Sequence, residues 1–193
     1  MAKTFFGIQV VINAFPVDSV QKRLHEIIAG SSAEQSLAEK RIFWKRLAAA
    51  LNDQVSAFDF GFWDLVRGGN ADEEFESWSS EIEGTLATEK EEMGAAPDEI
   101  NRISAEKRFV IVTLIFLLEE GSNTDQMLGE RCDMPESEYF TRTTFGRLIG
   151  AIPLFNFANV EADAVYLAPG SDEDGLSDED IHGGGYEYLK PLL

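Results

Sequence analysis

The sequence contains few of the residues from which catalytic and metal sites are usually built. It has one cysteine, Cys132, and two histidines, His25 and His182. A single cysteine excludes an internal disulfide, and two histidines exclude a zinc site made of several histidines. The glycine clusters do not have the context of phosphate-binding loops, and no nucleophile-elbow motif is present. These absences argue against most enzyme classes, and we predict no cofactor and no catalytic residue.

Basic residues are also scarce. The chain has 16 Lys and Arg against 35 Asp and Glu, which gives a net charge of −19. The imbalance begins after residue 60, because residues 1–60 carry seven basic and six acidic side chains, whereas the remainder carries nine and twenty-nine. Nucleic acids and anionic membranes require clustered Lys and Arg, so direct binding to either is disfavoured. A basic protein partner, bound cations and plain solubility stay open as explanations.

Long apolar segments are missing. The strongest apolar run, Phe109 to Leu118, has ten residues, whereas a helix needs about 20 to cross a bilayer. The N-terminal residues pass straight into an alternating segment and lack the features of a signal peptide. We therefore expect a cytoplasmic protein without a membrane segment. We expect one α+β domain over residues 1–193, with a partly irregular acidic tail from about residue 170.

The run from Phe109 to Leu118 predicts the centre of a β-sheet. Its residues are mostly β-branched or aromatic, and Thr113 is its only polar side chain. A strand that is apolar on both faces belongs in a sheet that is covered on both sides. The candidates for the second cover are the 71–106 helix, the C-terminal tail and a second subunit, so a homodimer is one of three alternatives.

Three further segments alternate with the period of a strand. They are Phe5–Ala14, Val55–Val66 and Val160–Ala168. Gln9 is among the residues that interrupt one side of the first segment, which predicts a half-buried strand. In the second segment, Phe58, Phe60 and Phe62 are predicted to share one face.

Helical spacing of apolar residues predicts the helices between these strands. The predicted helices cover residues 17–28, about 33–52, 71–106 and a segment that carries Phe140, Phe145 and Leu148. The second is predicted to begin at a capping box formed by Ser32 and Gln35 and to include Leu37 in its apolar stripe. Residues 121–136 are predicted to be a loop.

The order of these elements indicates an α+β fold. Together they give a four-stranded, mainly antiparallel sheet in the βαββαβ order of ferredoxin-like domains. The 71–106 segment is then a helical insertion between the second and third strands. The other helices cover one face of the sheet.

Several segments resemble, in the same order, those of a known family. They are Gly7–Ala14, Ile28–Ser32, the strand around Trp63, Val110–Leu114, Leu148–Ile152 and Leu176–Asp180. The family is the domain of unknown function 1517, which includes cyanobacterial, bacterial and chloroplast proteins. The resemblance implies a shared fold along nearly the whole chain but no reaction, because the family has no established catalytic residues. The chain lacks the family's membrane-proximal part, and it has Tyr166 and Leu167 where the family has a tryptophan.

Acidic and aromatic side chains form the candidate interaction surface. Its predicted residues are Glu73, Glu74, Glu76, Trp78, Asp172 and Asp174. The acidic loop around Asp172 resembles part of a calcium loop, but the register would place Gly170 and Ile181 at ligand positions, so we predict no metal there. Asp178 and His182 are spaced for one helical face, but the glycines that follow leave little helix to hold a metal pair.

Three functions are compatible with these features. The first is a non-catalytic protein-interaction or scaffold domain. The second is an acidic inhibitor or adaptor that binds a basic protein through the 71–106 surface or the acidic loop. The third is a small-ligand-binding protein or enzyme with a pocket between the aromatic strand and the long helix, near Trp63 and Trp78.

Overall fold

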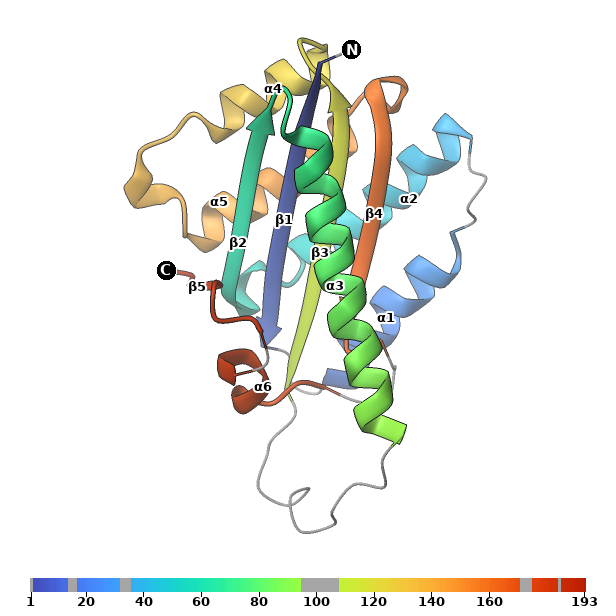
Figure 1. The fold of residues 1–193 in the computed structure, drawn as a ribbon, viewed down its shortest axis with the longest axis vertical. Helices are drawn as coiled ribbons and strands as arrows, with labels where there is room; N and C mark the ends of the chain where they lie inside the picture. The colour runs from blue at the N-terminus through green and yellow to red at the C-terminus, as the bar shows by residue number, and fades with distance from the viewer. Residues whose placement is uncertain (1, 14–16, 32–35, 95–107, 171–174, 184) are drawn as a thin grey trace.

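A five-stranded antiparallel sheet in the order β4-β3-β1-β2-β5 is the centre of the computed structural model (Figure 1). The structure describes residues 2–13, 17–31, 36–94, 108–170, 175–183 and 185–193. The strands are β1 (Lys3–Asn13), β2 (Phe58–Arg67), β3 (Phe109–Glu119), β4 (Val160–Ala168) and β5 (Lys190–Pro191). The helices are α1 (Val17–Ala29), α2 (Leu37–Asn52), α3 (Ala71–Gly94), α4 (Asn123–Cys132), α5 (Arg142–Ile149) and α6 (Asp178–Gly183).

The α+β class and the four predicted strands are confirmed, but the predicted strand order is wrong. In a ferredoxin-like sheet the second strand would pair with the third and the fourth with the first. Here β1 pairs with both β2 and β3, and β4 pairs with β3. A fifth, two-residue strand pairs with β2. The local pattern of each strand was visible in the sequence, whereas the choice of neighbour depends on the connections.

The helix α3 is the connection that decides this order. Because β2 and β3 are both antiparallel to β1, they run parallel to each other, and parallel strands require a crossover. Figure 1 shows α3 passing over β1 and β3 on the front of the sheet. The segment predicted to be an insertion is therefore the crossover itself. Its predicted continuation over residues 95–106 lies outside the described residues.

Helices cover both faces of the sheet. The larger core lies between one face and helices α1, α2, α4 and α5, and it contains the even-numbered apolar residues of β3 such as Val112 and Phe116. On the opposite face, Ile115 and Leu117 pack with α3, and Phe109 and Ile111 pack with the C-terminal segment around α6. Two of the three predicted covers, the long helix and the tail, are thus present within one chain. The reason for expecting a dimer to cover this face is removed.

The first strand is buried on both faces, which corrects the prediction of a half-buried strand. Every residue from Thr4 to Ile12 is buried. Gln9, the polar residue that suggested exposure, is 2% exposed, and its side-chain amide donates a hydrogen bond to Thr113 Oγ1 at 2.9 Å. Burial of a side-chain amide is tolerated where its hydrogen bonds are made.

A bulge in β2 separates the three phenylalanines that were predicted to share a face. Ile12 pairs with Phe58 and Val11 pairs with Phe60, so Asp59 is an extra residue in the strand. Phe58 consequently enters the larger core, while Phe60 and Phe62 lie on the side of α3 and α6. The prediction holds for Phe60 and Phe62 and is wrong for Phe58.

Two helix predictions also need correction. The helix α2 begins at Leu37 after a capping box of Ser36 and Glu39, and Leu37 is exposed instead of belonging to the buried stripe. The predicted capping box of Ser32 and Gln35 lies outside the described residues. The predicted loop 121–136 contains α4, whose N-terminus is capped by Ser122 accepting from the backbone N–H of Asp125. This Ser-x-x-Asp spacing was a usable signal in the sequence.

Candidate functional site

The predicted acidic surface is only partly assembled. Glu73 and Glu76 are exposed and Glu74 is half-buried in the first turns of α3. Acidic residues in a first turn are stabilised by the positive end of the helix dipole. Asp172 and Asp174 lie outside the described residues. Trp78 does not share the exposed face of the glutamates, because it turns toward the sheet.

The missing side chain of Gly7 allows Trp78 to approach the sheet. A Cβ at Gly7 would lie 2.9 Å from Cζ3 of Trp78 and 2.7 Å from Cζ of Phe5. The rings of Phe5 and Trp78 meet edge to face with centroids 5.3 Å apart. The ring of Phe62 is tilted against that of Trp78, with ring centroids 6.0 Å apart. These ring contacts hold the half-buried side chain of Trp78 in place.

A cleft opens next to the Trp78 side chain, and we call it the aromatic cleft. It has a volume of about 190 Å³, and its lining residues are Phe62, Trp78, Glu81, Ile82 and Tyr188. The residues come from β2, α3 and the C-terminal segment. The Tyr188 ring stands at 87° to that of Phe62, with centroids 5.9 Å apart. Three aromatic rings and one carboxylate thus surround one opening.

A buried polar network lies beneath the aromatic cleft. Tyr188 Oη donates to Gln9 Oε1 at 2.6 Å, and Gln9 Nε2 donates to Thr113 Oγ1 at 2.9 Å. A small cavity of about 10 Å³ is lined by Gln9 and Thr113 and shares Glu81, Ile82 and Tyr188 with the cleft. The network anchors the C-terminal segment to the two central strands, which holds one wall of the cleft in place.

The electrostatics of the cleft keep Tyr188 neutral. The pKa of Tyr188 is raised to about 12, chiefly by burial and also by the negative charge of Glu81, while the hydrogen bond to Gln9 opposes both effects. Tyr188 therefore acts as a hydrogen-bond donor and an aromatic surface, not as an acid or base near neutral pH. Aromatic faces beside a carboxylate attract cations.

Trp63 does not belong to this cleft, which corrects the prediction of a pocket near both tryptophans. Adjacent residues of a strand point to opposite faces, so Phe62 faces α3 while Trp63 packs against the larger core. The indole N–H of Trp63 donates to the carbonyl of Tyr139 at 2.9 Å. The pocket beside the aromatic strand depends on Phe62 and Trp78.

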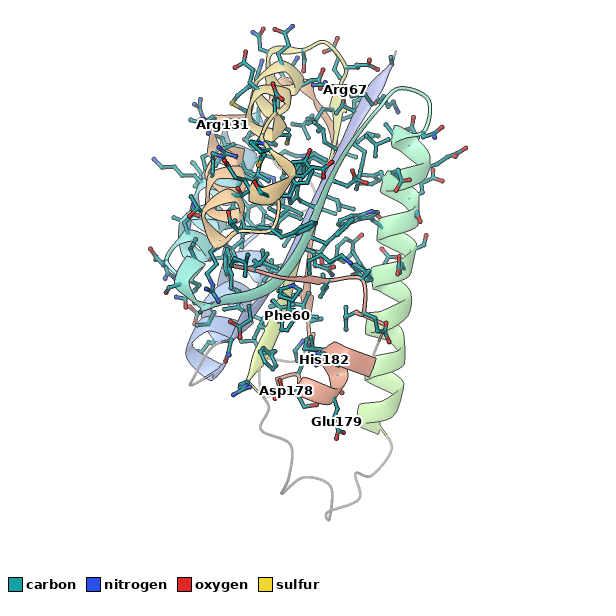
Figure 2. All side chains as sticks on the ribbon, turned by 90° about the vertical axis from the view of Figure 1, so that its left-hand side faces the viewer. Phe60, Arg67, Arg131, Asp178, Glu179 and His182 are labelled. Atoms are coloured by element: carbon teal, nitrogen blue, oxygen red, sulfur yellow. The ribbon has the colours of Figure 1, made fainter. Side chains whose placement is uncertain are left out.

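The candidate pair Asp178 and His182 has structural partners. His182 Nδ1 lies 2.7 Å from the Asp178 carbonyl oxygen, and its ring meets Phe60 edge to face at 5.6 Å. Figure 2 shows Phe60, Asp178 and His182 together around α6, at the opposite end of the sheet from Arg67. Within the described ranges, no group of three or more His, Cys, Asp or Glu side chains is placed to hold a metal ion.

Cys132 is not an activated nucleophile. Burial raises the pKa of its thiol to about 11, although the charges of Arg67 and Arg147 oppose this. A catalytic cysteine requires a lowered pKa. The side chain of Cys132 in α4 instead packs against the larger core.

Sequence reasoning identified Trp78 but missed Glu81 and Tyr188 as its partners. Glu81 follows Trp78 by three residues, and this spacing places both on one side of a helix. That signal was available in the sequence. The position of Tyr188 depends on the contact with Gln9, 179 residues away along the chain, and no local pattern contains it.

The comparisons with known proteins identify no relative. No family model matches the chain, no curated protein is similar to it, and no solved structure matches its fold. Among the described residues, no helix is both long and apolar enough to cross a membrane. The resemblance to the domain of unknown function 1517 stays a prediction, and the inference of function depends on the aromatic cleft and the surfaces around it.

Proposed function

We propose that this chain is a non-catalytic protein-interaction domain whose aromatic cleft receives one cationic side chain of a basic partner. The observation that carries the proposal is the set of three rings, Phe62, Trp78 and Tyr188, around an opening that Glu81 borders. The negative faces of aromatic rings attract ammonium and guanidinium groups, by about 0.5–2 kcal/mol at partly desolvated sites. A nearby carboxylate adds to this attraction.

The charge of the chain supports a basic partner. With a net charge of −19, the protein attracts basic surfaces over distances of about a Debye length and accelerates association with them. Glu73 and Glu76 are exposed on the same helix as Trp78 and Glu81. They contribute to this long-range attraction, while the aromatic cleft provides the specific contact.

The size of the cleft favours a side chain over a metabolite. Pockets for small-molecule ligands usually have volumes of about 300–1,000 Å³, whereas the aromatic cleft has about 190 Å³. One lysine or arginine side chain is of the appropriate scale. The buried Gln9 donates a hydrogen bond to Thr113 and accepts one from Tyr188, so both buried side chains support the position of Tyr188 in the cleft.

The test is the binding of a fluorescently labelled hexalysine peptide, measured by anisotropy. Glu81→Gln removes the carboxylate of the cleft, and Phe62→Leu removes one ring while keeping an apolar side chain. Glu73→Gln is the matched control, because it removes the same charge from an exposed position on the same helix. We expect Glu81→Gln and Phe62→Leu each to weaken binding about fivefold, and Glu73→Gln to weaken it less than about twofold.

Two results would overturn the proposal. One is the absence of hexalysine binding by the native protein. The other is an equal loss for Glu81→Gln and Glu73→Gln with no loss for Phe62→Leu, which would show that only the overall charge attracts the peptide. Circular dichroism of each variant verifies that the fold is retained.

A further inference from the structure

A second surface lies on the opposite layer of the domain, between α2 and the turns before β4. It is a groove of about 560 Å³, which we call the α2 groove. Its main lining residues are Leu37, Arg41, Ile42, Leu154, Phe155 and Phe157. Its position is independent of the aromatic cleft, because α2 covers the face of the sheet that α3 does not.

Exposed aliphatic side chains gather in this groove. Leu37, Ile42 and Leu154 are 55%, 60% and 57% exposed. Among the described residues, the other large hydrophobic side chains with high exposure are Tyr188 at the aromatic cleft and Leu193. A cluster of exposed apolar side chains in a concave surface is typical of a protein-binding site.

The two walls of the α2 groove are fixed to the core. On the α2 wall, Lys40 forms an ion pair with Asp163 of β4, and the Trp44 indole N–H donates to the same carboxylate at 2.9 Å. On the other wall, Phe155 is buried against Phe116 with ring centroids 5.1 Å apart. A groove that is already formed costs less ordering free energy when a partner binds.

Unpaired cations lie on the α2 side of the groove. Arg41 lines it, and Lys45 and Arg46 follow on the exposed side of the same helix. In the part of the chain that the structure describes, none of the three forms an ion pair, which is also true of Lys22, Arg131, Arg147 and Lys190. The described Lys and Arg side chains that do form ion pairs are Lys3, Arg23, Lys40, Arg67, Arg108 and Arg142. A basic patch on a chain with a net charge of −19 is complementary to acidic ligands, and its charges are available.

We infer that the α2 groove binds an amphipathic segment of a partner protein that carries both aliphatic and acidic side chains. The aliphatic side chains occupy the space between Ile42 and Leu154, and the acidic side chains pair with Arg41, Lys45 and Arg46. An anionic membrane fits less well, because a concave groove does not present its apolar residues to a flat surface.

The test uses a short helical peptide of leucine and glutamate, labelled for anisotropy, together with the same peptide with glutamine in place of glutamate. The native protein is expected to bind the acidic peptide at least about tenfold more tightly than the neutral one. Arg41→Glu and Ile42→Ser are each expected to weaken binding about tenfold. Lys22→Glu, an equal charge change at an exposed position of α1, is the matched control and is expected to change it less than about twofold.

Further measurements identify the other occupants. Binding of phosphatidylcholine–phosphatidylserine vesicles that Ile42→Ser abolishes, without peptide binding, would assign the groove to a membrane and overturn the proposal. A dimer in light scattering that Ile42→Ser dissociates would assign it to a second copy and also overturn it. Equal peptide binding by native protein, Arg41→Glu and Ile42→Ser would show that the groove is not the site. Ile42 is largely exposed, so its replacement is expected to leave the melting temperature nearly unchanged.

Discussion

The hydroxyl of Tyr188 donates a hydrogen bond of 2.6 Å to the buried side-chain carbonyl of Gln9, which joins the C-terminal segment to the central strand of the sheet. Gln9 is 2% exposed and has its amide nitrogen engaged with Thr113. The contact fixes a wall of the aromatic cleft and satisfies a buried acceptor at the same time. The stability of the sheet and the shape of the cleft therefore depend on the same bond.

Removing this hydroxyl should destabilise the protein. Tyr188→Phe leaves Gln9 Oε1 buried without its donor, and we expect a loss of about 1–3 kcal/mol in the free energy of unfolding. Urea unfolding followed by fluorescence measures the loss. The matched control is Tyr166→Phe, because the Tyr166 hydroxyl makes only an exposed, 3.4 Å contact with Glu83. A loss as large in the control as in Tyr188→Phe would contradict the prediction.

Ionisation of Tyr188 should lower the free energy of unfolding at alkaline pH. The folded state raises the pKa of Tyr188 from 10 to about 12, so its neutral form is favoured by folding. The corresponding stability is complete below pH 10 and is lost as the pH rises toward 12. We expect the free energy of unfolding to fall across this interval, and to fall less steeply in Tyr188→Phe. Urea unfolding at several pH values provides the measurement, and identical slopes would refute the prediction.

Asp125 should be essential for the stability of the end of the sheet where α4 begins. Its carboxylate is 5% exposed and accepts from Arg67 Nε at 2.9 Å and from the Gly121 backbone N–H at 2.8 Å. Asp125→Asn removes the charge and places an amide among donors, so we expect a loss of about 3 kcal/mol. Asp53→Asn is the control, because the ion pair of Asp53 with Arg23 has the same 2.9 Å length but is exposed. It should cost less than about 1 kcal/mol, and thermal and urea unfolding compare the two variants.

Gly61 should not accept a side chain. A Cβ at this position would lie 2.5 Å from Cε1 of Phe145 and 2.9 Å from the carbonyl oxygen of Gln9. We expect Gly61→Ala to reduce stability by about 2 kcal/mol or more through overpacking. A Cβ at Gly69 would have no atom within 4 Å. The free energy of unfolding of Gly69→Ala is therefore expected to remain within about 0.5 kcal/mol of that of the native protein. Equal melting temperatures for the two variants would contradict this account.

Cys132 should react slowly in the folded protein. Burial raises the pKa of its thiol from 9 to about 11, which reduces the thiolate fraction near neutral pH about a hundredfold. Alkylation by iodoacetamide, followed by mass spectrometry, should therefore be at least that much slower in the native protein than in urea. Comparable rates in both states would show that the thiol is not shielded.

The strands could be predicted because each carries a local pattern. The apolar run of β3 and the alternation of β4 are visible without knowledge of their neighbours. The polar Gln9 was misleading, since its partner Thr113 is 104 residues away and an isolated polar residue suggests exposure. The bulge at Asp59 is equally invisible in a periodic pattern, because one extra residue reverses the direction of Phe58.

The candidate sites were less predictable because they combine distant segments. Trp78 and Glu81 share one helix, but Phe62 and Tyr188 come from other parts of the chain. In the α2 groove, Leu37 was predicted to belong to the apolar stripe of its helix, and its exposure follows from how α2 lies against Asp163. Such sites depend on tertiary contacts, which composition and spacing do not encode.

The pairing of β1 with β3 has a kinetic consequence. The two strands at the centre of the sheet join residues about a hundred positions apart, as in the contact of Gln9 with Thr113. Closing so long a loop costs chain entropy before the pairing stabilises anything, and proteins with many distant contacts fold over milliseconds to seconds. The apolar surface of Phe109–Leu118 is therefore exposed during folding until β1 pairs with β3. In this interval the chain is most vulnerable to aggregation.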